Sequence, residues 1–339
     1  MRLLPVFLLA ATLPAQSIST LIGTGSPGFD DSSVNNPYGM TMGPDGGLYF
    51  CDIDNHAVRR IDVKTRKVTT VVGTGKKGNS GDGGPALKAE MDQPYEVRFD
   101  RAGNLFVVDM PNHAIRRVDG KSGVISTVAG TGVAGFAGDG GPAVKAQFKQ
   151  PHSIAFDREG RLLVCDIGNN RVRRIDLKSG LIETYLGPLK GPRALAFDAN
   201  WDLYLVLREG NSVLKVDSKS GAMTTVAGTG AKGLTGDGGP ATAATFNGPK
   251  GISFGPDGSY YLADTENHVI RRVDGKTGVV TTVAGSGKRG DGPGDGGDDS
   301  VGGADPRGCA MNRPHGVFVG PDGVLYIGDS EAHRIRMVR

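Results

Sequence analysis

The chain has 339 residues, with 39 Lys and Arg against 36 Asp and Glu, for a formal net charge of +3. A balance this even, without a basic run, excludes a nucleic-acid binder that depends on phosphate contacts. The 55 glycines and 19 prolines approach a low-complexity composition, but hydrophobic residues make up 38% and recur in a regular order. At this length a single core normally divides, unless the fold is built from stacked repeats.

The first fifteen residues have the pattern of a secretory signal peptide. Met1 and Arg2 precede an apolar run from Leu3 to Leu13, which is too short to span a bilayer. We predict cleavage after Ala15, so that residues 16–339 form the mature domain. The expected product is a secreted or periplasmic protein without a membrane span.

The three cysteines add no covalent framework. Cys51, Cys165 and Cys309 are odd in number and far apart in the sequence. This pattern argues against a disulfide scaffold and against a cysteine-based zinc site. For Cys51 and Cys165 we expect the role of small buried apolar side chains.

The remainder of the chain consists of six similar units, each opened by a proline. These prolines are Pro37, Pro94, Pro151, Pro192, Pro249 and Pro314. Fifteen residues after the proline stands an aspartate, except in the fourth unit, where Leu207 takes its place. Paired arginines then follow in four of the units. Self-similarity at such a period indicates a repeat architecture.

Within a unit the hydrophobic periodicity is that of β-strands. In the second unit Val97 and Phe99 alternate with polar residues, as in extended chain. Further strands are predicted at Leu105–Val108, Ala114–Val118 and Val124–Ala129, separated by turns rich in Gly, Pro, Asp and Asn. Four short antiparallel strands describe a propeller blade. The predicted fold class is therefore all-β, a six-bladed β-propeller.

The two ends of the chain are predicted to share one blade. The last unit stops at Arg339 after only three strands. The segment from Ile18 to Gly25 reads like the segment from Ile125 to Gly132, which contains the fourth strand of the second unit. Pairing of the N-terminal strand with the C-terminal blade would close the ring and remove an exposed strand edge.

The residues of these units resemble a known repeat. The segments that begin at Asp109 and Asp264, each with Asn-His before the strand and a pair of arginines in it, resemble the NHL repeat. The recurring linker Gly-Thr-Gly followed by Gly-Asp-Gly-Gly-Pro-Ala is similar to the NHL regions of teneurin-like proteins. The resemblance covers residues 17–339 and implies a propeller. It implies no single activity, because NHL propellers include lyases, sensor domains and adhesion modules.

Loop lengths identify the end of the propeller that is expected to bind. The linkers between units are long, about twenty residues from Gly73 to Gln93, and they share an end with the loops between second and third strands and with the opening prolines. Long loops on a rigid scaffold are where function concentrates. Before Pro192 the spacing between prolines falls from 57 to 41 residues. We predict a notch there that opens the central channel; the alternative is a decayed repeat around Leu207.

The residue after each proline is expected to lie near the axis, at the channel mouth. The six residues are Tyr38, Tyr95, His152, Arg193, Lys250 and His315. Two tyrosines, two histidines and two cations favour a small polar or anionic ligand, or a protein partner. The following position is mostly small, but one unit has Glu96 there. That carboxylate either pairs with Arg98 or acts as a ligand or base.

A second resemblance keeps an enzymatic alternative open. The Pro-His segments at Pro151 and Pro314 resemble zinc-ligand segments of the peptidyl-hydroxyglycine amidating lyase propeller. By that resemblance His152 and His315 would hold zinc, with Tyr95, Glu96 and Arg193 as catalytic candidates. A catalytic zinc site normally has three protein ligands, and the ring has no third histidine. The alternatives are a noncatalytic binding propeller and a metal-assisted lyase or hydrolase; no cofactor is certain, and zinc or calcium remains open.

The repeated polar residues are predicted to be structural. Asp82, Asp139 and Asp237 precede a Gly-Gly-Pro sequence at which a short helix can begin, although calcium binding is the alternative. The aspartate-rich segment 291–305 is either a weak cation site or a solvated loop. The aspartates fifteen residues after each proline are expected to cap loops or pair with the arginines. A loop-stabilising role is predicted for His56, His113, His268 and His333.

Overall fold

The computed structural model describes residues 16–292 and 305–339. The predicted signal peptide, residues 1–15, lies outside the described residues, as do Asp295, Asp298 and Asp299 of the aspartate-rich segment. In the part that is described, no helix is long and apolar enough to cross a membrane.

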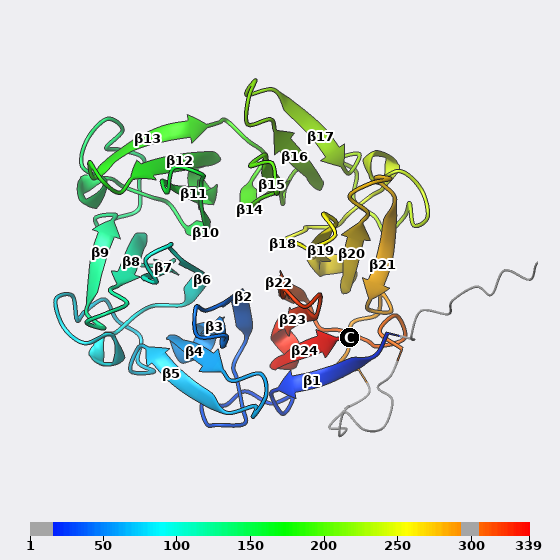
Figure 1. Cartoon of the computed structure of the whole chain (residues 1–339), viewed down its shortest axis with the longest axis horizontal. Coiled ribbons are helices and arrows are strands. Elements are labelled where there is room, and N and C mark those ends of the chain that lie inside the picture. Colours follow the sequence, from blue (N-terminus) through cyan, green and yellow to red (C-terminus); the bar gives the residue numbers. More distant parts are fainter. Residues whose placement is uncertain (1–15, 293–304) are drawn as a thin grey trace, which may run out of the picture.

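Six antiparallel sheets of four strands surround a central axis, as the sequence predicts (Figure 1). Blade 1 contains β2 (Pro37–Met42), β3 (Leu48–Asp52), β4 (Ala57–Ile61) and β5 (Val68–Val72). Blade 2 contains β6 (Pro94–Phe99), β7 (Leu105–Asp109), β8 (Ala114–Val118) and β9 (Ile125–Ala129). Blade 3 contains β10 (Pro151–Phe156), β11 (Leu162–Asp166), β12 (Arg171–Asp176) and β13 (Leu181–Leu186). Blade 4 contains β14 (Pro192–Phe197), β15 (Leu203–Leu207), β16 (Ser212–Val216) and β17 (Met223–Ala227). Blade 5 contains β18 (Gly251–Phe254), β19 (Tyr260–Asp264), β20 (Val269–Val273) and β21 (Val280–Ala284). Blade 6 contains β22 (Pro314–Val319), β23 (Leu325–Asp329), β24 (Arg334–Val338) and β1 (Ile18–Ile22).

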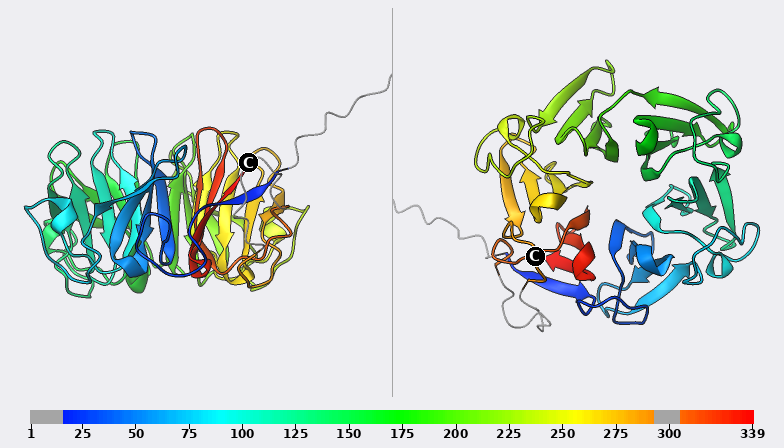
Figure 2. Two further views of the ribbon diagram at one scale, coloured as in Figure 1. Left: turned by 90° about the horizontal axis from the view of Figure 1, so that it is seen from below. Right: turned by 180° about the vertical axis from the view of Figure 1, so that it is seen from behind.

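The ring is closed by the first strand. β1 pairs with β24 in antiparallel register, with Ile18 opposite Val338, and lies at the outer edge of the C-terminal blade (Figures 1 and 2). Backbone hydrogen bonds between Ser17 and Arg339, at 3.0 and 3.1 Å, extend the ladder. Ile18 and Leu21 are buried. The sequence prediction of a blade shared between the two ends is confirmed.

The core lies between neighbouring blades, which explains why the pattern repeats around the ring. One cluster joins Phe106 and Ile115 of blade 2 to Ile154 and Val164 of blade 3, and Phe148 of the connecting linker completes it. No blade buries its faces alone, as is usual for stacked repeats. Cys51 and Cys165 are buried free thiols, as expected for small apolar side chains, and Cys309 is also buried.

Three of the long linkers are each anchored by a single helical turn. The one-turn 3-10 helices η2 (Ala86–Lys88), η3 (Ala143–Lys145) and η5 (Ala241–Ala243) begin directly after the linker prolines. Their first alanines are buried. The predicted short helix is confirmed, with the length of one turn. The other one-turn helices, between second and third strands, are η1 (Ile53–Asn55), η4 (Ile167–Asn169), η6 (Thr265–Asn267) and η7 (Ser330–Ala332).

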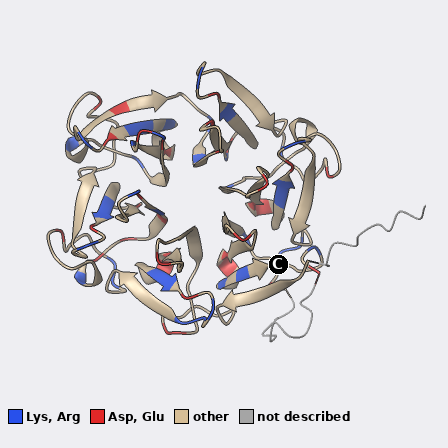
Figure 3. Ribbon diagram, viewed as in Figure 1, with Lys and Arg blue, Asp and Glu red and all other residues tan. Residues whose placement is uncertain are grey.

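The linker aspartates bind arginine. Arg173 of β12 is fully buried, and its Nη2 lies 2.7 Å from Asp139 Oδ1. Arg116 makes the same contact with Asp82, at 2.6 Å, and Arg271 with Asp237, at 2.8 Å. Figure 3 shows the basic residues on the third strands around the ring. These contacts support the structural interpretation of the linker aspartates over the calcium alternative.

In five blades the second strand ends in an aspartate that completes the buried network. Asp166 Oδ2 lies 3.6 Å from Nη1 of Arg173. The same carboxylate accepts hydrogen bonds from the backbone N–H of Lys149 (2.8 Å) and from the side-chain amide of Asn169 (2.8 Å). It therefore both caps the loop and pairs with the arginine, as the sequence predicts.

Blade 4 departs from the pattern because its linker is missing. In blades 2, 3 and 5 the buried arginine pairs with an aspartate of the preceding long linker. The short connection Gly187–Gly191 before blade 4 supplies no such aspartate. Leu214 stands at the arginine position and Leu207 at the strand-end aspartate, so the charged network is replaced as a unit by apolar side chains. The divergence of blade 4 thus coincides with its short linker.

The four loop histidines join each blade to the next. His113 has a left-handed backbone conformation (φ 50°), and its Nδ1 accepts a hydrogen bond from the backbone N–H of Gln150, the residue before the next proline (3.3 Å). His56, His268 and His333 make the same contact at 3.2 Å. In blades 3 and 4 the amide oxygens of Asn170 and Asn211 accept the equivalent hydrogen bond. The predicted loop-stabilising role is confirmed.

We expect this histidine contact to make stability dependent on pH. Burial lowers the pKa of His113 below its ordinary value of 6.5, and the accepting nitrogen must be unprotonated. The contribution is therefore full above about pH 7, begins to be lost as the pH falls below the ordinary value of 6.5, and is gone once the pH has fallen through the lower folded-state pKa. His113→Asn should stay within about 1 kcal/mol of wild type at pH 8 and show a shallower acid loss, because asparagine accepts this bond in two blades. His113→Ala should lose about 1–3 kcal/mol, from the left-handed backbone and the lost bond. Denaturant melts at pH 5 and 8 test this; equal acid slopes in wild type and His113→Asn would contradict it.

Candidate functional site

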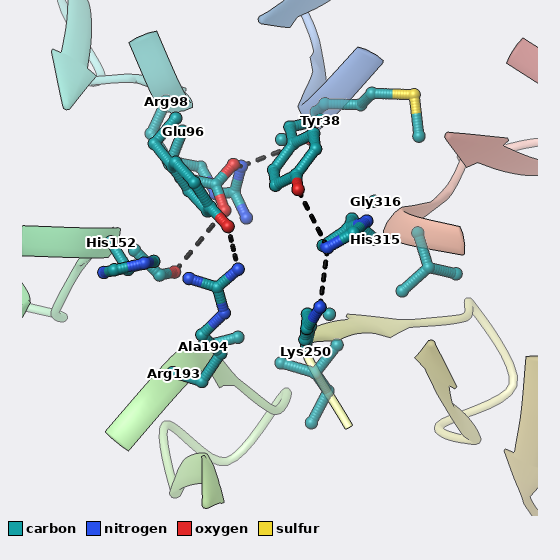
Figure 4. Close-up of a pocket in the computed structure, with 16 residues that line it drawn as sticks. Tyr38, Glu96, Arg98, His152, Arg193, Ala194, Lys250, His315 and Gly316 are labelled. Carbon is teal, nitrogen blue, oxygen red and sulfur yellow. Dashed lines mark hydrogen bonds and ion pairs between the residues drawn. The ribbon is translucent and has the colours of Figure 1, made fainter. Parts of the chain in front are cut away.

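The six residues that follow the opening prolines converge at the channel mouth, as predicted (Figure 4). Each lies at the start of the innermost strand of its blade, or directly before it in the case of Lys250. The innermost strands approach closely there. A side chain at Gly251 would come within 2.6 Å of the backbone oxygen of His315, which explains the small residue after Lys250. The backbone thus directs six different side chains toward one small space.

On one side of the ring His315 connects a tyrosine to a lysine. Its Nδ1 lies 2.8 Å from the backbone oxygen of Arg313, so Nδ1 carries the proton and donates. The lone pair of Nε2 therefore faces the Tyr38 hydroxyl at 2.8 Å and Lys250 Nζ at 2.7 Å. The Tyr38 and His315 rings also stack, with centroids 4.1 Å apart. His315 is held as a neutral acceptor between two donors.

On the other side Arg193 and Tyr95 are in contact. The guanidinium donates a hydrogen bond to the Tyr95 hydroxyl and lies over the Tyr95 ring, 4.5 Å from its centroid. Tyr95 also packs edge-to-face against Tyr38 and His152. The aromatic rings of blades 1, 2 and 3 therefore form a continuous wall opposite the cations of blades 4 and 5 (Figure 4).

Burial and mutual repulsion disfavour charge in the ring. Burial, with smaller contributions from nearby Arg208 and Arg313, lowers the pKa of Arg193 to about 9. Burial lowers the pKa of Lys250 to about 7, and the neighbouring Arg193 acts in the same direction. Burial likewise lowers the pKa of His152 to about 4 and that of His315 well below its ordinary value. Both histidines are therefore neutral near pH 7, and a bound anion would favour the charged forms of Arg193 and Lys250.

Glu96 lies deeper in the channel and pairs with Arg98. Its Oε1 is 2.5 Å from Arg98 Nη1, and its Oε2 accepts a weaker hydrogen bond from the Ser153 hydroxyl at 3.5 Å. Burial raises the pKa of Glu96. The predicted Glu96–Arg98 pair is confirmed. This pair holds the carboxylate in the channel, below the ring of six residues.

Above the ring a cavity of about 510 Å³ opens at the end that carries the long linkers. All six ring residues line it. Blades 3 and 4 contribute Ile167, Gly168, Asn170, Arg208 and Glu209, the residues around the short linker. The prediction that the mouth opens toward this notch is consistent with the lining.

The charges at the mouth leave one cation without a carboxylate. Lys250 Nζ lies 3.1 Å from Glu266, which also binds Arg313 at 2.7 Å. Arg208 pairs with its neighbour Glu209 at 2.9 Å. Arg193, which is 5% exposed, has no carboxylate within 4 Å in the described ranges. A buried cation is costly unless it is paired, so this position is suited to an anion.

The donor set around the two histidines does not fit a metal ion. His152 and His315 lie on opposite sides of the ring (Figure 4). The Nε2 of His315 is 2.7 Å from the cationic group of Lys250. Within residues 16–292 and 305–339 no group of three His, Cys, Asp or Glu side chains is placed to hold a metal. Metal binding by His152 and His315 stays a prediction.

Several residues at the mouth were not predicted from the sequence. Arg313 and Glu266 form the ion-pair network beside Lys250, while Met110, Ile167 and Gln150 line the cavity. Arg313 and Gln150 directly precede opening prolines, and Met110 and Ile167 directly follow strand-end aspartates. Comparison of these two columns across the six units places such residues at the end of the blades that carries the mouth, but it does not tell which of their side chains are exposed there.

The fold and its site define a class of protein: six-bladed β-propellers with a polar channel mouth at the long-loop end. Comparison with known families is consistent with this. The family model described as the teneurin NHL domain matches residues 199–293, and the NHL repeat model matches residues 148–175 and 311–336. The chain is a six-bladed β-propeller that contains NHL repeats.

Relatives support the repeat family without assigning an activity. NHL repeat-containing protein 2 of Bos taurus is 30% identical over 346 residues, which cover 94% of this chain and 41% of that protein. The chain thus spans about two fifths of that relative's length. A probable peptidyl-alpha-hydroxyglycine alpha-amidating lyase of Caenorhabditis elegans is 27% identical over 139 residues, 40% of this chain and 36% of that protein. The crystal structure of an auxiliary nutrient binding protein from Bacteroides thetaiotaomicron superimposes with a TM-score of 0.71 at 19% identity, covering 96% of this chain and 76% of that one. This last likeness concerns the fold alone.

Proposed function

We propose that the protein is an exported binding module that holds a small polar or anionic ligand, free or displayed by a protein partner, at the channel mouth. The observation that carries this proposal is Arg193, a buried cation at the floor of a 510 Å³ opening, with no carboxylate of the described residues within 4 Å. An incoming carboxylate or phosphate would supply the missing charge and accept hydrogen bonds from the guanidinium. Export rests on the pattern of the first fifteen residues.

The neighbours of Arg193 suit the same ligand. Lys250 gains from a nearby anion because its charged form is disfavoured by burial and by Arg193. Nδ1 of His152 lies 2.6 Å from the backbone oxygen of Gln150 and carries the proton, so Nε2 is an acceptor. That nitrogen offers a hydrogen-bond acceptor for a ligand hydroxyl or amide. The ring thus combines donors for an anionic group with one acceptor for a polar one.

Binding is favoured over lyase or hydrolase chemistry by the state of the candidate catalytic groups. The Tyr95 hydroxyl accepts a hydrogen bond from Arg193, and Glu96 is held by Arg98 below the ring. Glu96, the carboxylate among the catalytic candidates, does not line the mouth cavity, and the Tyr95 hydroxyl, although it keeps its proton, is already in contact with the guanidinium. A general acid or base needs hydrogen-bond reach to its substrate.

Arg193→Gln tests the proposal. Thermal melts with acetate, benzoate, citrate or inorganic phosphate, at ionic strength matched with NaCl, should show at least one anion stabilising the wild type. At a concentration one hundred times its Kd the gain is about 2.7 kcal/mol. Arg193→Gln should abolish this gain. Arg161→Gln serves as control, because Arg161 lies in the turn between β10 and β11 and pairs with Asp157. Equal stabilisation of all three proteins, or none in the wild type, would refute the proposed site.

A further inference from the structure

The mouth has chemically different halves, which is visible at the position after each strand-end aspartate. The six residues at this position are Ile53, Met110, Ile167, Arg208, Thr265 and Ser330. In an up-and-down blade this position begins the loop that faces the mouth. Its side chain therefore decides what each blade presents to a ligand.

In three blades the side chain at this position points into the protein and not into the mouth. Ile53 is 3% exposed and packs in the core between blades 1 and 2. The hydroxyl of Thr265 donates to the backbone oxygen of Pro314, and that of Ser330 donates to the backbone oxygen of Pro37, both at 2.7 Å. Blades 1, 5 and 6 therefore turn these side chains into the protein and leave nothing apolar at this level of the mouth.

The other three blades, which are adjacent, leave the position open. Met110 of blade 2 and Ile167 of blade 3 are partly exposed and line the cavity, and Arg208 of blade 4 lines it beside them. His152 and Gln150 lie on the same stretch of wall. Two apolar side chains at a polar mouth therefore adjoin the side where Arg193 lacks a carboxylate.

We infer that the ligand is an amphipathic anion: a carboxylate or phosphate carrying an aliphatic or aromatic body of a few carbon atoms. The anionic group lies on Arg193 and the apolar body covers Met110 and Ile167. This deepens the proposed function and rests on it. Met110 and Ile167 are the residues that set specificity, because contact with them stabilises a ligand that has apolar surface, which a small inorganic anion lacks.

Paired probes separate this inference from the proposed function. Hexanoate and acetate carry the same charge and differ by four methylenes, and hexanol matches hexanoate in its chain without the charge. Each methylene fully removed from water is worth roughly fourfold in affinity. With partial burial of the chain, hexanoate should bind the wild type at least ~10-fold more tightly than acetate. Hexanol should bind far more weakly than hexanoate.

The variants assign that preference to the two residues. Calorimetric titration of Met110→Ser/Ile167→Ser should retain acetate affinity and lose the hexanoate preference, whereas Arg193→Gln should lose both ligands. Leu87→Ser, at an exposed linker residue of blade 1, is the control for loss of an apolar side chain. Melting curves verify that each variant is folded. If acetate and hexanoate bind wild type equally, or if the double variant keeps the preference, the inference fails while the anion site stands. If no anion binds, both fail.

Discussion

Asp166→Leu is expected to destabilise the protein by about 3–5 kcal/mol, since it leaves the buried charge of Arg173 facing an apolar side chain. Arg173 is fully buried, with Asp166 at 3.6 Å, and Asp139, its other carboxylate, is itself 40% exposed. The substitution also strands the backbone N–H of Lys149, which donates to Asp166. Urea unfolding at pH 8 measures the loss. This pH keeps the carboxyl ionised, because burial raises the pKa of Asp166.

Blade 4 supplies the design of a compensating variant. It has Leu207 and Leu214 at the positions of Asp166 and Arg173. The double variant Asp166→Leu/Arg173→Leu should therefore lose at least ~1 kcal/mol less than the sum of the two single losses. Compensation should be incomplete, because the linker of blade 3 still carries Asp139 and Lys149. Strictly additive losses would show that the two side chains are not coupled.

An exposed ion pair on the same sheet provides the control. Arg174, next to Arg173 in the sequence, pairs with Glu183 across β12 and β13, and the Glu183 side chain is 54% exposed. Exposed pairs contribute 0–1 kcal/mol, so Glu183→Gln should change stability by less than about 1 kcal/mol. A similar loss at both sites would mean that burial is not what makes the Asp166 contact valuable.

The architecture could be predicted because the six units of a repeat protein can be aligned with one another within a single sequence. Once the opening prolines were aligned, the strands, the shared blade and the ring of residues behind the prolines followed from position alone. The side-chain contacts in the channel were harder to predict from the sequence. The pairing of Glu96 with Arg98 was foreseen as one of two alternatives, since the residues are two apart on one strand. The contact between Tyr95 and Arg193 joins residues 98 positions apart. Only ring geometry brings them together.

The mouth was predicted incompletely for a related reason. Arg313, Met110 and Ile167 occupy repeat columns that in other blades hold buried or structural side chains, such as Ile53. Column identity tells where a residue lies but not whether it is covered by its neighbours. Exposure depends on packing between blades, and at blade 4 on the length of a linker. Sequence reasoning found the notch but not the apolar residues beside it.

Deletion of residues 16–22 is expected to abolish cooperative folding. The segment buries Ile18 between blades 5 and 6, and Leu21 and Ile22 between blades 6 and 1, and each such side chain is worth about 1.5–3 kcal/mol. Their sum rivals the total stability of a typical domain, 5–15 kcal/mol. The deletion also exposes the edge of β24, which invites association. Calorimetry and size-exclusion chromatography should show a lost or broadened transition and larger species, whereas removal of residues 1–15 alone should leave both unchanged.

A circular permutant tests whether folding requires only that β1 is present, or also that β1 is the N-terminal segment of the chain. The permutant begins at Pro37, continues through Arg339, and is joined by Gly-Lys-Ser-Gly to residues 17–36. In blade 2 the segment 120–123 has this sequence and connects β8 to β9, and Ser17 and Arg339 are already paired. The permutant should therefore melt cooperatively as a monomer. Closure of the ring by β1 is required if the permutant folds and the deletion does not. A monomeric deletion variant that melts like wild type would show that the blade is stable with three strands, and the ring geometry behind the proposed site would lose its main support.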